Sequence, residues 1–215
     1  MICALPLNIT EKASPRPLIH VCDNFFNDPY NVRNTALKVE YHSLKDEFPA
    51  NSSSWPGFRS YHVSDFLADK MVSEVKYYTK NQSLTLESIS FQYITGDYGE
   101  GWFHTDPTAL YTCMVYLAVD SPSYSGTEVC DFSSEFKDAG GKERRDFYND
   151  NRNFLKRYKY DRMTRRHNSR FDPIATISHR FNRFVLFESR LYHRAQKYFG
   201  TCMEDSRLSL IAFLK

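Results

Sequence analysis

Hydrophobic positions recur with a helical period in the first part of this 215-residue chain, after a short apolar strand predicted at 18–26. Asp28 and Pro29 mark the start of a helix, because Asp can cap a first turn and Pro is tolerated there. That helix is predicted to reach about Tyr41. Residues 45–60, rich in Ser, Asn and Pro, predict a loop. Ser64 can cap a second helix, whose apolar face consists of Leu67, Met71, Val75 and Tyr78.

After Ser83 the pattern changes to short apolar segments separated by Gly and Pro, which is typical of strands joined by turns. A fold with helices first and many short strands afterwards is predicted to be α+β and mainly β, built around a β-sandwich or open barrel. The predicted strands cover residues 84–95, 102–106, 111–119, 126–132, 175–178, 183–188, 192–198 and 207–214.

Residues 139–170 interrupt the strands and predict a basic helical insertion. From Gly141 to Arg170 there are eleven Lys and Arg against four Asp and Glu. A charged helix is most often a solvated face, and this is the first interpretation. The insertion is alternatively a cover over a pocket, a surface for an acidic partner, or a nucleic-acid contact aided by nearby aromatics. These aromatics are Phe147, Tyr148, Tyr158 and Tyr160.

Composition limits the class of protein. Hydrophobic residues make up 41% of the chain and the formal charge is +2, so we expect one folded domain over 1–215 and no strong attraction to nucleic acid or anionic membrane. Scattered cysteines without a CxxC pair predict reduced thiols. The apolar residues 1–7 are too few for a secretion signal, and no segment approaches the ~18 apolar residues of a membrane span. The chain is expected to be soluble, intracellular and cytoplasmic.

The first chemical signal is His104-Thr105-Asp106. On a strand, side chains two residues apart share a face, so an imidazole and a carboxylate at this spacing can hold one metal ion. Taken alone the pattern is weak, because His-x-Asp is frequent by chance. His193, after the apolar segment 184–187, adds a second histidine. Two histidines and one carboxylate on one side of a metal favour non-haem iron(II), with zinc as the rival.

Arg207 on the last predicted strand decides between these metals. Arg207 and Ser209 share a face with Ile211 and Phe213. The other face consists of Leu208, Leu210, Ala212 and Leu214. A guanidinium in such a strand is costly to bury unless an anion meets it, and it fits a carboxylate bidentately. The distal carboxylate of 2-oxoglutarate is such an anion. The alternative is a rim Arg paired with an acidic side chain.

The segments around these residues resemble those of a known enzyme family. The segment Phe91-Gln92-Tyr93-Ile94-Thr95-Gly96-Asp97-Tyr98 followed by His104-Thr105-Asp106 resembles the approach to the metal in prolyl-4-hydroxylase-like dioxygenases. Residues 112–117 with 126–128, and 181–193 with 207–209, are also similar to that superfamily, nearest to an uncharacterised clade. The resemblance covers roughly 84–132 and 175–214. It implies a double-stranded β-helix (jelly-roll, cupin-like) core with the N-terminal helices packed outside.

The resemblance also implies cofactors and site residues. It assigns His104, Asp106 and His193 as catalytic iron(II) ligands, Arg207 with Ser209 as the anchor for 2-oxoglutarate, and Tyr93 and Thr112 as further co-substrate contacts. O2 is the second co-substrate, and ascorbate is a possible reductant. The chain departs from the pattern at two places. The stretch from Tyr93 to His104 is longer, and Arg207 stands where prolyl hydroxylases use Lys.

The implied reaction is hydroxylation of an amino acid, a peptide or a protein side chain, with release of succinate and CO2. Halogenation is not expected, because Asp106 fills the position that a halide would need. The alternatives are the same chemistry on a nucleobase, a non-catalytic β-barrel binding protein, and a zinc hydrolase.

Substrate contacts are the least determined part of the sequence. Arg59, in the possible lid 55–61, is a candidate to hold a substrate carboxylate, with a surface Arg in a packed turn as the alternative. Trp102 is a candidate pocket wall or a core aromatic. The remaining histidines are read as structural or surface residues, with His179 as the rival of His193.

Overall fold

The computed structural model describes residues 17–43, 55–130 and 154–215. The apolar N-terminal segment, Cys3, most of the predicted loop at 45–60 and the first half of the basic insertion lie outside these residues. The helices are α1 (Pro29–Ala36), α3 (Asp65–Thr79) and α5 (Phe154–Asn168), with a 3-10 turn η1 at Gly96–Tyr98. The strands are β1 (Ile19–Cys22), β2 (His42–Ser43), β3 (Phe58–Ser60), β4 (Leu86–Ile94), β5 (Tyr111–Tyr116), β6 (Thr127–Cys130), β7 (Pro173–Ile177), β8 (Phe184–Glu188), β9 (Tyr192–Ala195) and β10 (Arg207–Leu214).

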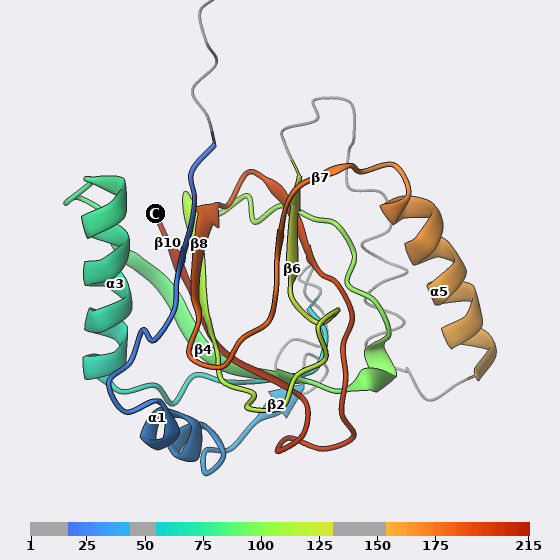
Figure 1. Ribbon diagram of the computed structural model, residues 1–215, viewed down its shortest axis with the longest axis horizontal. Helices are drawn as coiled ribbons and strands as arrows, with labels where there is room; N and C mark the ends of the chain where they lie inside the picture. The colour runs from blue at the N-terminus through green and yellow to red at the C-terminus, as the bar shows by residue number, and fades with distance from the viewer. Residues whose placement is uncertain (1–16, 44–54, 131–153) are drawn as a thin grey trace, which may run out of the picture.

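Two antiparallel sheets form the core of the fold. Within the described ranges, the larger sheet has the order β1-β8-β5-β10-β4-β3-β2, and the smaller has the order β7-β6-β9. After β5 the chain passes back and forth between the two sheets, with β6, β7 and β9 in the smaller sheet and β8 and β10 in the larger. This arrangement is a double-stranded β-helix, as the resemblance implied. Figure 1 shows α1 and α3 on one side of the larger sheet and α5 on the far side of the molecule, beyond the smaller sheet.

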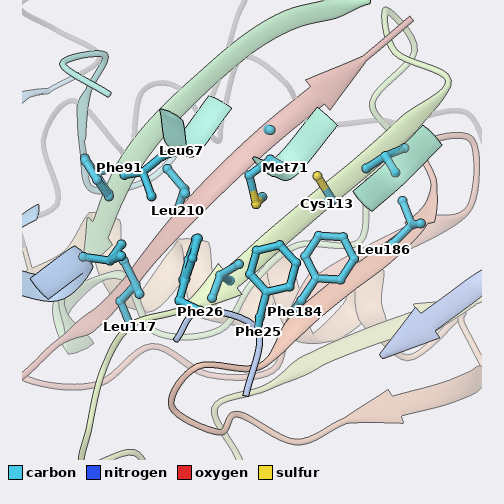
Figure 2. Close-up of a cluster of buried hydrophobic side chains, with 14 of the residues drawn as sticks. Phe25, Phe26, Leu67, Met71, Phe91, Cys113, Leu117, Phe184, Leu186 and Leu210 are labelled. Carbon is cyan, nitrogen blue, oxygen red and sulfur yellow. The ribbon is translucent and has the colours of Figure 1, made fainter. Parts of the chain in front are cut away.

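The main hydrophobic core lies between the larger sheet and the helices α1 and α3. The predicted stripe Leu67, Met71 and Val75 of α3 is buried there. Phe184 and Leu210 meet it from the sheet, and both are fully buried, which stabilises the fold by about 1.5–3 kcal/mol each. Figure 2 shows Met71, Phe184 and Leu210 in one cluster with Phe25 and Phe26, which come from the segment before α1.

A second cluster fills the space between the two sheets. It includes Met114, Val185 and Ile211 from the larger sheet and Val129 from β6. The predicted alternation of β10 is confirmed, because Leu208, Leu210, Ala212 and Leu214 all belong to the helix-facing core. Ile211 and Phe213 belong to the cluster between the sheets. One strand therefore serves both cores.

The predicted helix start at Asp28 is confirmed. The Asn31 backbone N–H donates to the Asp28 carboxylate at 3.1 Å, and Pro29 is the first helical residue. The helix ends at Ala36, earlier than the predicted Tyr41, whose hydroxyl instead donates to the Ala36 carbonyl. In α3, Ser64 is the N-cap residue but its side chain makes no capping hydrogen bond.

Two predicted segments are corrected by the structure. Residues 58–60, predicted as loop, form β3 and pair with β4, because Phe58 and Ser60 find cross-strand partners in Tyr93 and Phe91. Residues 102–106, predicted as a strand, form no ladder. Only His104 makes a bridge, to His193 of β9. The remaining predicted strands are present with ends shifted by a few residues.

Helix α5 holds the segment that leads to His104. The Asn168 side chain donates to the Gly101 carbonyl at 2.9 Å and accepts from the Phe103 N–H at 3.2 Å. The His167 ring bonds the Phe103 carbonyl at 2.9 Å and stacks on Trp102 at 4.0 Å. This part of the insertion is therefore more than a solvated face, although five of its basic side chains are exposed: Lys159, Arg162, Arg165, Arg166 and Arg170.

No helix in the described part of the chain is long and apolar enough to cross a membrane. The cysteines at described positions (Cys22, Cys113, Cys130 and Cys202) are all unbridged, as predicted.

We expect Asn168→Ala to lower the free energy of unfolding by about 1–3 kcal/mol, because it leaves a buried N–H and a buried carbonyl without their partner. Urea unfolding followed by circular dichroism measures this. Ser169→Ala, at an exposed neighbouring position, is the control and should change stability by less than about 0.5 kcal/mol. Equal stabilities for the two variants would contradict the role of Asn168.

Candidate metal centre

Three side chains, two from the segment 104–106 and one from β9, converge on the wall of one cavity. One donor atom each of His104, Asp106 and His193 lies within 4.8 Å of the others. The Asp106 carboxylate lies 3.8 Å from Nε2 of His104 and 3.1 Å from Nε2 of His193. The structure thus brings together the three residues that the sequence singled out, in an arrangement of two imidazoles and one carboxylate suited to a divalent metal.

Backbone pairing sets this convergence. His104 and His193 exchange two backbone hydrogen bonds, at 3.1 and 2.9 Å, so their side chains emerge side by side. The Asp106 N–H donates to the Ser189 carbonyl at 2.9 Å, which holds the residue against the turn between β8 and β9. Residues 102–106 do not form the regular strand that the sequence predicts. The geometry instead comes from one bridge and one anchoring hydrogen bond.

Both imidazoles have a defined orientation. Nδ1 of His104 lies 2.7 Å from the Trp102 carbonyl, and Nδ1 of His193 lies 3.0 Å from the Leu191 carbonyl. A carbonyl only accepts hydrogen bonds, so each Nδ1 carries the proton. Nε2 is then the nitrogen of each ring that faces the Asp106 carboxylate, and it is the atom that can bind a metal ion once it is unprotonated.

A hydrogen bond from Thr112 orients the Asp106 carboxylate. Thr112 donates its hydroxyl to Asp106 Oδ2 at 2.8 Å and also contacts the Ser189 hydroxyl at 2.8 Å. Burial by itself raises the pKa of Asp106. The charge of His193, its hydrogen bond and the lesser contributions of His104 and Thr112 outweigh burial and hold that pKa well below its ordinary value. Asp106 is therefore an anion across the physiological range.

A buried guanidinium lies on the wall of the same cavity. Arg207 is 4% exposed, and its polar contacts are the Ser125 carbonyl at 3.3 Å, the Thr127 hydroxyl at 3.3 Å and the Met114 sulfur at 3.8 Å. No carboxylate among the described residues forms an ion pair with it. The sequence alternative of a rim Arg with an acidic partner therefore does not hold within this part of the chain. A buried unpaired charge is costly, so this position is suited to an anionic ligand.

Tyr116 packs against Arg207, and His179 packs against Tyr116. The guanidinium lies 5.4 Å from the centre of the Tyr116 ring, whose hydroxyl bonds Thr127 at 2.6 Å. The His179 ring stacks on Tyr116 at 4.3 Å. Burial, with a lesser contribution from the Arg207 charge, lowers the pKa of His179 to about 3. His179 is thus a neutral core residue and not part of the candidate metal centre.

The other predicted site residues divide into two groups. Arg59 and Trp102 line the cavity together with the metal candidates and Arg207. Ser209 is on the cavity face of β10 but is only 1% exposed. Tyr93 is a correction, because it faces the helix side of β4, where it stacks on Phe58 at 4.7 Å. Thr112 contacts the Asp106 carboxylate through its hydroxyl.

Sequence reasoning missed several cavity residues. Gln92, Met114 and Thr127 line the cavity, and each lies on a strand next to residues that the sequence analysis had examined. The period of two along β4 was a usable signal for Gln92, because Phe91 and Tyr93 are apolar and face the helices. Thr127 gave no such signal, since its contact with Arg207 joins residues distant in the sequence.

Several solved structures are similar to this fold. HygX from Streptomyces hygroscopicus, with nickel, 2-oxoglutarate and hygromycin B bound, matches with a TM-score of 0.59 and 13% identity over 92% of this chain and 82% of that one. The alpha-ketoglutarate-dependent epimerase SnoN of nogalamycin biosynthesis matches with a TM-score of 0.58 and 11% identity over 93% and 78%. A prolyl hydroxylase from Trichoplax adhaerens, in complex with a peptide fragment, matches with a TM-score of 0.52 and 12% identity over 91% and 82%.

The fold is therefore that of the non-haem iron and 2-oxoglutarate-dependent oxygenases. A comparison with curated proteins gave no match. The chain itself belongs to the family described as "Family of unknown function (DUF6445)", which it matches over residues 7–214.

We expect Thr112→Val to weaken divalent metal binding about 10–100-fold, because it removes the hydroxyl that orients the Asp106 carboxylate while keeping the side-chain shape. Titration with cobalt(II), followed by visible absorbance, measures the affinity. Thr112→Ser keeps the hydroxyl and should bind within a few-fold of the wild type. An unchanged affinity in Thr112→Val would show that this hydrogen bond does not position the carboxylate.

Acid should destabilise the protein partly through His179. The unfolded histidine binds a proton near its ordinary pKa of 6.5, whereas the folded one does so only near 3, so stability falls as the pH drops from 6.5 toward 3. One such group contributes a slope of up to ~1.4 kcal/mol per pH unit. Urea unfolding at several pH values should show a shallower slope for His179→Phe. The exposed His62→Phe serves as the control, and equal slopes for all three proteins would refute this role.

Proposed function

We propose that this protein is an iron(II)- and 2-oxoglutarate-dependent dioxygenase, with His104, Asp106 and His193 as the metal ligands and Arg207 as the anchor of the co-substrate. The observation that carries the proposal is Arg207. A buried guanidinium with no acidic partner among the described residues shares one cavity with two imidazoles and a carboxylate. A dicarboxylate that chelates a metal at one end matches both features.

The donor set fits iron(II). Two Nε2 lone pairs and one carboxylate on the same side leave the opposite coordination positions for the keto acid and O2. A zinc hydrolase would use the same three ligands, but it would give Arg207 no anion to bind. The protonated Nδ1 atoms and the Thr112 hydroxyl hold these ligands in place before any metal arrives.

When bound, the ferrous ion would supply the activation of O2 coupled to decarboxylation of 2-oxoglutarate, with succinate and CO2 as products. The protein provides orientation. Thr127 and the Ser125 carbonyl fix the Arg207 fork, so that its remaining N–H groups can hold the distal carboxylate bidentately. Met114 and Ile211 line the cavity between Arg207 and the metal candidates, and such apolar walls exclude water from the reacting groups.

The proposed outcome is hydroxylation of a small molecule, an amino acid or a peptide side chain. Asp106 supports hydroxylation over halogenation, because its carboxylate occupies a ligand position. The neighbours of this fold act on more than one kind of substrate, since HygX was solved with hygromycin B and the prolyl hydroxylase with a peptide. The exposed basic side chains of α5 keep a nucleic-acid substrate as the alternative, which predicts an affinity for oligonucleotides that falls steeply with salt.

The test is anaerobic titration with iron(II) and 2-oxoglutarate, followed by the visible charge-transfer absorption of the metal–keto acid chelate. Arg207→Met should weaken 2-oxoglutarate binding about 100-fold, because it removes one partner of a buried charge pair. Metal binding should persist in that variant. Asp106→Ala should lose the absorption and the succinate formed on addition of O2.

Arg162→Met is the matched control, since Arg162 is exposed on α5 and should leave both affinities unchanged. The absence of the absorption and of succinate in folded wild-type protein would overturn the proposed function. Retention of wild-type 2-oxoglutarate affinity in Arg207→Met would overturn the assignment of the anchor.

A further inference from the structure

A methionine sulfur lies beside the buried guanidinium in the cavity. Met114 of β5 is 5% exposed and lines the cavity together with the metal candidates and Arg207. It is the cross-strand partner of Ile211 in β10, so both side chains leave the sheet on the face toward the smaller sheet. A small molecule that enters the cavity therefore meets the Met114 side chain.

The sulfur is in contact with two hydrogen-bond donors. Nη2 of Arg207 and the Thr127 hydroxyl each lie 3.8 Å from Sδ of Met114. Both contacts join different parts of the fold, because Arg207 begins β10 and Thr127 begins β6. A thioether accepts hydrogen bonds only weakly, so the unmodified methionine leaves both donors available for better acceptors.

The contact with Arg207 concerns the side of the guanidinium that a ligand needs. Its Nε–H donates to the Ser125 carbonyl at 3.3 Å, and Nη2 donates to the Thr127 hydroxyl at 3.3 Å. Nη2 carries two N–H groups, and the second is the one that the Met114 sulfur can accept. A carboxylate held bidentately by Nη1 and Nη2 would use this same N–H. A weak acceptor at this point gives the N–H up, whereas a strong one would keep it.

Oxidation turns this weak acceptor into a strong one. In the reaction with hydrogen peroxide, the sulfur lone pair forms a bond to one peroxide oxygen while the O–O bond breaks. The other oxygen leaves and, after proton transfer, becomes water, so the thioether is oxidised as the peroxide is reduced. The product is a sulfoxide, which is polar and carries an exposed acceptor oxygen. That oxygen also occupies volume beside the guanidinium.

We propose that Met114 is a site of oxidation by hydrogen peroxide, and that its sulfoxide engages Arg207 and thereby blocks the binding of 2-oxoglutarate. The inference rests on the proposed function, because it takes Arg207 as the anchor of the co-substrate. The reduced thioether is then the permissive state of the cavity. The sulfoxide oxygen competes with the distal carboxylate for one N–H group and for the space in front of it.

Two other methionines of the chain serve as internal references. Met71 of α3 is fully buried in the core between the helices and the larger sheet. Met203 is half-buried in the segment between β9 and β10. Access through the cavity should therefore make Met114 react faster than Met71, although both side chains are removed from the outer surface.

The first experiment locates the oxidation. The full chain, freed of metal by a chelator, is treated with hydrogen peroxide and then with dithiothreitol, which reduces oxidised thiols and leaves sulfoxides in place. Peptide mass mapping detects the added oxygen as about 16 Da. We expect Met114 to be oxidised at least ~10-fold faster than Met71. Zinc(II) with saturating 2-oxoglutarate should slow the oxidation of Met114 and leave that of Met203 unchanged.

The second experiment measures the consequence by calorimetric titration of 2-oxoglutarate into the zinc(II)-loaded protein. Oxidation should weaken binding to the wild type about 10–100-fold, because hydrogen bonds to charged groups are strong. Met114→Leu, compared with its own untreated sample, should keep its affinity through the same treatment. Met203→Leu is the matched control and should lose affinity as the wild type does. Met114→Gln carries an amide oxygen near the sulfur position, so it should bind weakly before any treatment.

Oxidation of Met114 no faster than that of Met71, in protein whose Met203 is fully oxidised, would overturn the proposed site. An unchanged 2-oxoglutarate affinity after complete oxidation of Met114, or an equal loss in Met114→Leu, would overturn the link to Arg207. Neither result would affect the dioxygenase proposal. Failure of the untreated wild type to bind 2-oxoglutarate would instead remove the proposed function and this link with it, and the mass of the Met114 peptide would still decide whether the site is oxidised.

Discussion

The structure depends on β10 having two different faces. Leu208, Leu210, Ala212 and Leu214 close the hydrophobic core under α1 and α3, while Arg207, Ile211 and Phe213 face the cavity between the sheets. The strand is central in the larger sheet, paired with β4 and β5, so the stable core fixes its register. Because side chains alternate along a strand, a register fixed by one face also fixes the positions of the polar groups on the other.

The candidate metal centre combines this rigid sheet with a less regular wall. Asp106 is held by Thr112 of β5, whereas His104 belongs to a segment with a single bridge to β9. That segment is secured by Asn168 at the end of α5. Hydrogen bonds from the insertion thus replace the ladder that a longer strand would have provided. The insertion is part of the support of the site, and its exposed basic face is available for other contacts.

The two ends of the cavity carry opposite charges. Asp106 lies at one end as a stable anion beside two imidazoles, and Arg207 lies toward the other as a buried cation. A ligand with a metal-chelating group and a distant carboxylate satisfies both ends at once, and burial strengthens each interaction. Arg59 adds a second positive point on the aromatic wall.

The sequence by itself determined the local features of the protein, because these depend on the spacing of apolar residues and on residues adjacent in the chain. It predicted the cap at Asp28, the buried stripe of α3, the two faces of β10 and the residue types of a His-x-Asp and His metal set. Tertiary structure alone decided the rest. The bridge between His104 and His193, the support of Asp106 by Thr112, the wrong assignment of Tyr93 and the strand at 58–60 all depend on pairing between distant segments. A one-residue change of register reverses which side chains face a cavity, and that register is set by packing across the whole sheet.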